Sequence, residues 1–228
     1  MNISKQSALH LSLSLIVFSW LYQLFLARPL DIQAAGFSGF VIRIAFVKSI
    51  YLISIILFHK IERESWSELG FTFKNWKTQL LIGFLGGLAM FLFISVGLNS
   101  FLNSLFPKPT ESGGILSYFT DTRNLYIWLI VGIVGGGFVE ELVRIFVLTR
   151  FQKKFQQYGL YFALICSSFL FGFGHLYQGA GAAISTGISG LLLGIIYIRR
   201  RSALEVIAMH AFNDVFAILA AYQLMSHR

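Results

Sequence analysis

The chain has 228 residues, of which 56% are hydrophobic and only 12% are charged, whereas soluble globular domains carry about 25% charged residues. This balance excludes an ordinary soluble enzyme and indicates an integral membrane protein. The 18 Lys and Arg residues exceed the 10 Asp and Glu residues, but they stand between apolar runs and do not form one basic face, so no nucleic-acid partner is predicted.

Seven apolar runs, bounded by charge, Pro or Gly, are long enough to cross a bilayer as helices. They cover residues 9–27, 37–58, 78–103, 125–150, 159–177, 180–198 and 203–225. An isolated strand in lipid would leave its backbone groups unpaired, so each run is expected to be helical. We therefore predict an all-α, polytopic transmembrane bundle of about seven helices in contact with membrane lipid.

The first run follows Lys5 in the manner of a signal peptide, but no small-x-small cleavage site follows it. We expect it to remain as the first transmembrane helix. The second run contains Arg43 and Lys48. These side chains either snorkel to the membrane surface or line an interior cavity.

The basic residues predict the topology. With seven spans, eleven bases fall on the side of the amino terminus: Lys5, Lys60, Arg63, Lys74, Lys77, Arg150, Lys153, Lys154, Arg199, Arg200 and Arg201. Four fall on the other side: Arg28, Lys108, Arg123 and Arg228. The asymmetry predicts a cytosolic amino terminus. On the cytosolic side, the segment 62–77 with Trp66 and Trp76 is expected to lie at the membrane interface. On the opposite side, the segment 107–123 is expected to be a polar external loop.

Three ionisable residues, Glu140, Glu141 and Arg144, stand inside an apolar run from Leu125 to Leu148. Charged groups at that depth are costly unless they face a polar interior, so this run is a candidate functional site. A simpler reading is a buried ion pair that fixes helix packing, with Arg144 opposite either glutamate.

Polar partners for these acids occur in two later spans. His175 ends the fifth run, and His210 in the seventh run is followed by Asn213 and Asp214, which can share its helical face. A lone buried histidine is usually structural, and Asp214 would then hold the His210 tautomer. Phe171, one turn before His175, is expected to be a core residue.

A depth estimate brings these groups into one layer. If the fourth helix turns near Gly159, Glu140 and His175 differ in depth by roughly 5 Å at 1.5 Å per residue. Measured from the basic residues at the cytosolic ends of their helices, Glu140 lies about 15 Å deep and His210 about 13 Å deep. This depth favours an opening toward the cytosol.

Small residues allow the helices to approach closely. Gly132 and Gly136 precede Glu140 at four-residue intervals, and Gly187, Gly190 and Gly194 form a similar row in the sixth run. Such rows are common in membrane helices and by themselves indicate packing alone.

These residues resemble the CPBP family of CAAX proteases and bacteriocin-processing, or Abi-type, intramembrane enzymes. The resemblance rests on Glu140-Glu141, on Phe171 to His175 and on His210 to Asp214, in the family's order, and it covers about residues 125–225. The family usually places an arginine four residues after the second glutamate, where this chain has Ile145 and carries Arg144 one position earlier.

The resemblance implies hydrolysis of peptide bonds in membrane-associated, including prenylated, proteins or peptides, in a bacterial cell membrane. It implies that Glu140 and His175 activate a water molecule, and that His210 with Asp214 or Asn213 stabilises the oxyanion. Glu141 and Arg144 complete the candidate catalytic set. It also implies a catalytic core in residues 125–228, preceded by helices and loops in residues 1–124, within one integrated domain.

No cofactor is expected in the favoured interpretation. The alternative is a catalytic zinc ion held by Glu140, His175 and His210, since family members are often labelled metalloproteases. The single cysteine, Cys166, excludes an intrachain disulfide and a cysteine-ligated zinc site. Two other functions compete with proteolysis: a proton-coupled transporter, and a catalytically idle family member that binds a partner or confers bacteriocin immunity.

Overall fold

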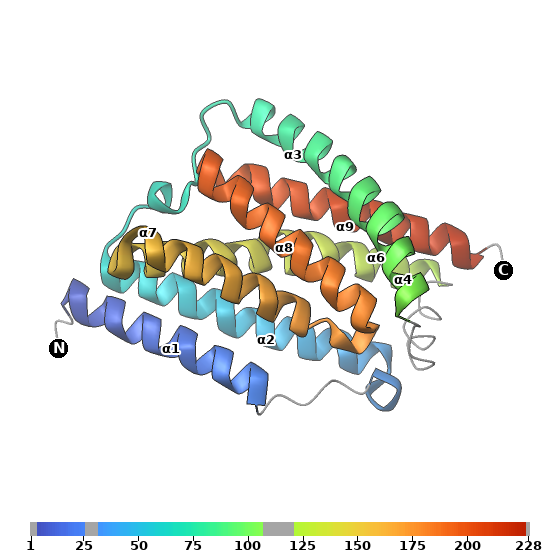
Figure 1. Ribbon diagram of the computed structural model, residues 1–228, viewed down its shortest axis with the longest axis horizontal. Coiled ribbons are helices and arrows are strands. Elements are labelled where there is room, and N and C mark those ends of the chain that lie inside the picture. Colours follow the sequence, from blue (N-terminus) through green and yellow to red (C-terminus); the bar gives the residue numbers. More distant parts are fainter. Residues whose placement is uncertain (1–3, 26–31, 107–120, 227–228) are drawn as a thin grey trace.

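The computed structural model describes residues 4–25, 32–106 and 121–226, and most of the predicted external loop lies outside these ranges. The longer helices are α1 (Lys5–Phe25), α2 (Ile32–Glu62), α3 (Trp76–Met90), α4 (Asn99–Leu105), α6 (Thr122–Ile130), α7 (Glu141–Phe173), α8 (Ala180–Arg200) and α9 (Ala203–Ser226). The chain is thus a helical membrane bundle (Figure 1).

Within the described residues, five stretches are long and apolar enough to cross a membrane: α1, residues 35–62 of α2, residues 76–105, α8 and α9. The two remaining predicted spans correspond to α6 with the start of α7, and to the second half of α7. Helix α7 is interrupted at Phe155 and Gln156, where Gln156 has a φ of 57°. The turn predicted near Gly159 therefore comes a few residues earlier.

Two wider, π-helical segments are built into the spans. Segment η2 (Phe91–Leu98) joins α3 to α4, and segment η4 (Val131–Glu140) joins α6 to α7. Such turns are rare and occur often at functional sites. In η4 the wide turns include Gly132 and Gly135 to Gly137, and the segment ends at the first of the two adjacent glutamates.

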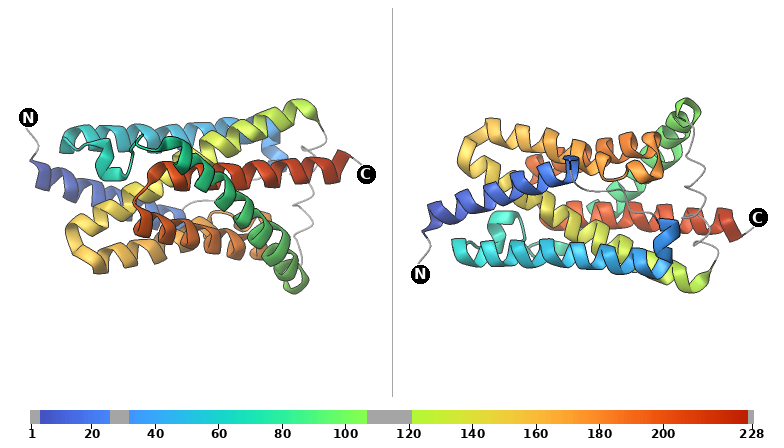
Figure 2. Two further views of the ribbon diagram at one scale, coloured as in Figure 1. Left: turned by 90° about the horizontal axis from the view of Figure 1, so that it is seen from above. Right: turned by 90° about the horizontal axis from the view of Figure 1, so that it is seen from below.

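The glycines mark where helices meet. Helix α3 packs on α9, α7 on α8, and η4 on α9, as the two views in Figure 2 also show. A Cβ on Gly83 would lie 2.4 Å from Ala208 Cβ, and one on Gly172 would lie 2.4 Å from the Ala183 carbonyl oxygen. Larger residues there would force the helices apart. Because α3 packs on α9, the amino-terminal helices are joined closely to the carboxyl-terminal ones.

The segments expected on the cytosolic side all meet at one end of the bundle. Arg201 Nη2 donates to Gln152 Oε1 (2.7 Å), and Ala203 N donates to Gly70 O (3.0 Å). Helix α1 begins at this end, whereas α9 ends at the opposite one (Figure 1). The predicted grouping of these loops is confirmed, and their placement in the cytosol stays a prediction.

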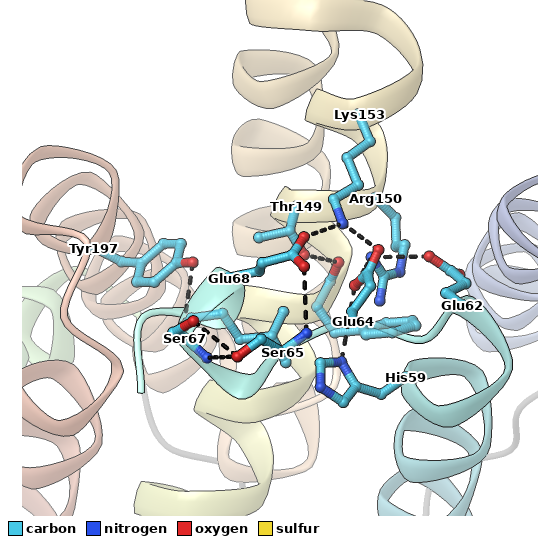
Figure 3. A network of polar contacts seen from close by, with 12 residues as sticks. His59, Glu62, Glu64, Ser65, Ser67, Glu68, Thr149, Arg150, Lys153 and Tyr197 are labelled. Atoms are coloured by element: carbon cyan, nitrogen blue, oxygen red, sulfur yellow. Dashed lines mark hydrogen bonds and ion pairs between the residues drawn. The ribbon is translucent and has the colours of Figure 1, made fainter. Parts of the chain in front are cut away.

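A network of ion pairs lies at this end of the bundle, which we call the basic end (Figure 3). We call its members the basic-end cluster: His59, Glu62, Glu64, Arg150 and Lys153. Arg150 is fully buried and contacts Glu62 (3.2 Å) and Glu64 (2.7 Å). Lys153 bonds Glu64 as well. Burial would raise the pKa of Glu64, but the bonds from Lys153 and Glu62 and the nearby Arg150 outweigh it and lower that pKa to about 2.

The interfacial segment begins with a capped turn. Ser65 accepts a hydrogen bond from the backbone of Ser67, and the Glu68 side chain accepts one from the Ser65 backbone. The short helix that follows, η1 (Trp66–Leu69), leaves Trp66 42% exposed. An aromatic ring at this end of the bundle agrees with the predicted interfacial position.

Candidate active site

Glu140 is the last residue of η4 and Glu141 is the first residue of α7. This junction follows the part of η4 that packs on α9. His210 and Asp214 lie one turn apart on α9, with His210 Nε2 3.6 Å from Asp214 Oδ1 and 3.9 Å from Glu140 Oε2. Three carboxylates and an imidazole from two helices thus lie together. With His175 from the end of α7, we call them the acid–histidine layer: Glu140, Glu141, His175, His210 and Asp214.

Glu141 is held from two sides. Arg144 Nε lies 3.2 Å from each of its carboxylate oxygens, and His210 Nδ1 lies 2.8 Å from Oε1. Glu141 and Arg144 are buried. A carboxylate accepts, so Nδ1 of His210 carries the proton and Nε2 faces Glu140 and Asp214. Helical spacing could not decide which glutamate pairs with Arg144, and the structure shows that it is Glu141.

Glu140 has a different partner. Lys48, from the middle of α2, donates a hydrogen bond to Glu140 Oε1, which leaves Oε2 on the side of His210. Both side chains are partly exposed, at 22% and 20%, and both line a cavity. Of the two sequence interpretations of Lys48, the structure supports the cavity lining. The residue was missed as a member of the site because no motif surrounds it.

His175 lies just beyond the end of α7, at the start of the short helix η5 (Leu176–Gln178). Its Nδ1 is 2.8 Å from the backbone oxygen of Phe171. A carbonyl oxygen can only accept, so Nδ1 is the donor and a neutral ring keeps a lone pair on Nε2. His175 also lines the cavity, so this nitrogen is available as a proton acceptor.

Phe171 has a larger role than the expected core packing. Its ring stands edge-on to both imidazoles, with centroids 5.0 Å from His175 and 5.9 Å from His210, and the Arg144 guanidinium lies 4.6 Å from its centre. One ring therefore separates and orients both histidines and the arginine.

Asp214 does not hold the His210 tautomer, contrary to that expectation. Glu141 occupies Nδ1 at 2.8 Å, whereas Asp214 faces Nε2 at 3.6 Å. Asn213 Nδ2 donates to Asp214 Oδ1 (3.2 Å), so the amide and the carboxylate act as a pair. The reason is the register of α9, which turns the Nδ1 side of His210 toward α7.

A cavity of about 800 Å³ borders the acid–histidine layer. Glu140, His175, His210 and Asp214 line it, whereas Glu141 and Arg144 do not. Its polar lining continues along Gln23, Arg43, Asn99, Asn103 and Gln178. The predicted set thus divides into residues that can touch a bound molecule and residues behind them.

The cavity lies on the side of the layer away from the basic end. Toward the basic end, Leu142, Ile145, Leu148, Leu193 and Val206 are fully buried in the core, and no member of the basic-end cluster lines the cavity. Gln23 and Asn103 instead lie near the opposite ends of their helices. The expected direction toward the cytosolic side was inferred from depth alone, and it does not match where the polar lining residues lie.

Glycines make room for this arrangement. A Cβ on Gly136 would lie 2.3 Å from Asp214 Oδ2, and one on Gly132 would lie 2.9 Å from Ile218 Cδ1. On α8, a Cβ on Gly190 would lie 2.7 Å from Arg144 Nη1. The two predicted glycine rows therefore adjoin the site itself, in addition to bringing the helices together.

The donors named for the zinc alternative have other partners in this arrangement. Among the residues that the structure describes, no group of three or more His, Cys, Asp or Glu side chains could hold a metal ion. Glu140 Oε1 is bonded to Lys48 and His175 Nδ1 to a backbone carbonyl.

Together, the bundle and the layer define a helical membrane protein with acids and imidazoles bordering an interior cavity. Residues 122–216 match the family model described as type II CAAX prenyl endopeptidase Rce1-like. Over these residues the chain is similar to that family, and the match confirms the resemblance seen in the sequence. No curated protein and no solved structure matched the chain.

Proposed function

We propose that the protein is an intramembrane endopeptidase that hydrolyses peptide bonds of membrane-associated, including prenylated, proteins or peptides. The observation that carries this proposal is the convergence of Glu140, His175 and His210 on one cavity of about 800 Å³. The family match supports the class of reaction. The proposed location is a bacterial cell membrane, with the amino terminus in the cytosol.

In the proposed reaction, a water molecule in the cavity attacks the carbonyl carbon of the scissile peptide bond. Glu140 Oε2, together with Nε2 of His175, accepts a proton from this water as the bond forms. The C–N bond then breaks and the proton passes to the leaving nitrogen. The second proton of the water also reaches the leaving nitrogen, so the products are a carboxylate and an ammonium group, and atoms and charges balance without a metal or other cofactor.

His210 is the proposed donor to the oxyanion. Its Nδ1–H is bonded to Glu141, and Glu140 and Asp214 lie near its Nε2. In the proposed reaction Nε2 carries a second proton and donates to the tetrahedral oxygen, an interaction worth about 3–4 kcal/mol in comparable sites. Asp214 and Asn213 border the same place. Glu141 and Arg144 act through His210 as positioning residues.

The test uses purified protein in detergent and a panel of internally quenched peptides, with and without a prenyl group. We expect cleavage by the wild-type protein and its loss, by about 100-fold or more, in Glu140→Gln and His175→Ala, since general-base groups contribute about 10²–10⁴-fold. The matched control is Glu68→Gln, which removes an acid at the basic end. Activity that survives chelation supports metal-free hydrolysis, and activity that is lost and then restored by zinc contradicts it.

Two outcomes would replace the proposal. Ion-driven uptake by vesicles without cleavage would identify a transporter. The absence of both activities, with a co-purifying membrane protein whose binding is unaffected by Glu140→Gln, would identify an idle family member. Cleavage that persists in both His175→Ala and Glu140→Gln would contradict the assigned base.

A further inference from the structure

The acid–histidine layer is short of positive charge in the part of the chain that matches the family model. Residues 122–216 contribute Glu140, Glu141 and Asp214 to the layer, and Arg144 pairs with only one of them, Glu141. A carboxylate at membrane depth is costly without a cationic partner. For Glu140, that partner is Lys48, which comes from α2, outside the matching region.

Lys48 lies too far from either end of α2 for its ammonium group to reach the membrane surface. The apolar span of α2 runs from Ala35 to Glu62, so Lys48 stands about 20 Å from either end at 1.5 Å per residue. A lysine side chain that snorkels reaches the surface only from positions near a helix end. Lys48 instead turns inward to Glu140 and lines the same cavity.

The contact with Lys48 also gives the two carboxylate oxygens of Glu140 different neighbours. Lys48 holds Oε1, while Oε2 lies 3.9 Å from His210 Nε2. The other charged or titratable groups around Glu140 are His210 and Asp214 from α9, His175 from the end of α7, and neighbouring Glu141. Three of these five neighbours, Lys48 and the two histidines, can carry positive charge.

We propose that Lys48 is a positioning residue for the reaction. It balances the charge of Glu140 and fixes its carboxylate so that Oε2 faces the attacking water. This inference rests on the proposed function and extends it to a helix that lies outside the family-matching residues. Lys48 makes no bond to the substrate in this role.

The first experiment measures peptide cleavage by Lys48→Met. We expect kcat to fall by about 10- to 100-fold with little change in KM, because Lys48 acts on a base whose own contribution is about 10²–10⁴-fold. Lys48→Arg should restore part of the activity, and the matched control Lys60→Met, an exposed lysine of the same helix, should leave it unchanged.

Chemical rescue separates this role from a structural one. Ethylammonium added to Lys48→Ala should raise kcat several-fold, because a small cation can occupy the space left beside Glu140. Sodium at equal ionic strength should not. Wild-type kcat in Lys48→Met, or a folded Lys48→Ala that ethylammonium does not restore, would overturn the proposal.

A second measurement does not depend on activity. Lys48→Met should lower Tm in the wild-type background and lower it much less in a Glu140→Gln background, since the charge to be balanced is then absent. Equal losses in both backgrounds would show that the two side chains are not coupled, and would overturn the proposal. If the wild-type protein cleaves no peptide but the coupling is present, the proposed function fails while the Lys48–Glu140 pair stands.

Discussion

This protein contains two buried networks of charged side chains that differ in what surrounds them. In the basic-end cluster, Arg150 is fully buried against Glu62 and Glu64, next to the capped turn at Ser65. In the acid–histidine layer, three carboxylates lie close to two imidazoles, and four of these five side chains line a cavity. The first network joins α2, and Glu64 just after it, to α7, and the second leaves polar side chains facing the cavity.

The difference shows how to separate stability from activity in a membrane protein. Charges that pair in a closed network connect helices, so their loss should unfold the protein. Charges that border a cavity are held by neighbours, as Glu140 is held by Lys48, so their loss should change chemistry more than folding.

The largest expected effect on kcat/KM comes from a comparison in which one histidine of each network is replaced by alanine. His210→Ala should lower kcat/KM by about 10²–10³-fold, the usual cost of removing an oxyanion donor, with a small change in Tm. His59→Ala should leave kcat/KM unchanged, since His59 belongs to the basic-end cluster. Cleavage assays on both purified variants give the two kcat/KM values. Equal losses of kcat/KM would contradict the assignment of different roles to the two networks.

Arg150→Met should give the largest loss of stability. Removing one partner of a buried ion pair costs about 3–5 kcal/mol, because the remaining charges are left without compensation. Thermal unfolding in detergent should show a clear fall in Tm, with kcat per folded molecule retained. Arg199→Met, an exposed arginine at the same end, is the control. An unchanged Tm for Arg150→Met would mean that the basic-end cluster contributes little to folding.

A pair of adjacent glycines tests the packing around the layer. The new methyl group of Gly136→Ala would lie 2.3 Å from Asp214 Oδ2, whereas that of Gly135→Ala would meet only Val131, at 3.8 Å. Overpacking costs about 1–3 kcal/mol, so Gly136→Ala should lower kcat/KM by about tenfold. Gly135→Ala should behave as the wild type. Kinetics of the two variants decide this, and identical values would refute the tight contact.

The smallest effect is expected from pH at the basic end. The pKa of Glu64 is about 2 in the folded protein, below the ordinary value of 4.5. The stabilisation is therefore complete above about pH 5 and is lost as the pH falls toward 2, since the unfolded chain takes up the proton first. Tm measured from pH 7 to pH 3 should fall less in Glu64→Gln than in the wild type. Parallel curves would contradict this linkage.

Much of the fold could be predicted because lipid imposes strong rules. Apolar length located the spans, and the positions of the bases grouped the loops at one end. The widened turns of η4 were not predictable, since glycines such as Gly135 and Gly136 occur equally in regular membrane helices. The interruption at Phe155 and Gln156 also has no local signal, because neither residue is a usual helix breaker.

The site was predictable where residues are close in sequence or share a motif. His210 and Asp214 were found by spacing, and Glu140 and Glu141 by their charge in an apolar run. The partner of Arg144 was not, because separations of three and four residues both bring side chains together on a helix. Lys48 stands 92 positions from Glu140, and only the tertiary arrangement reveals that they meet. The division into residues 1–124 and 125–228 stays a prediction.

The π-helical segment η4 has a consequence for how this span can change length. Each residue of an α-helix advances the direction of its side chains by about 100°. A π-helical turn holds about one residue more than an α-helical turn, so each of its residues turns the side chains by less than that. Removing one residue between Val131 and Val139 and closing a wide turn to an ordinary one would therefore keep α6 facing its present neighbours. A single-residue gap there would be silent in hydropathy, and the lost width would fall on glycines such as Gly136 and Gly137, which lie against Asp214 and Ala211.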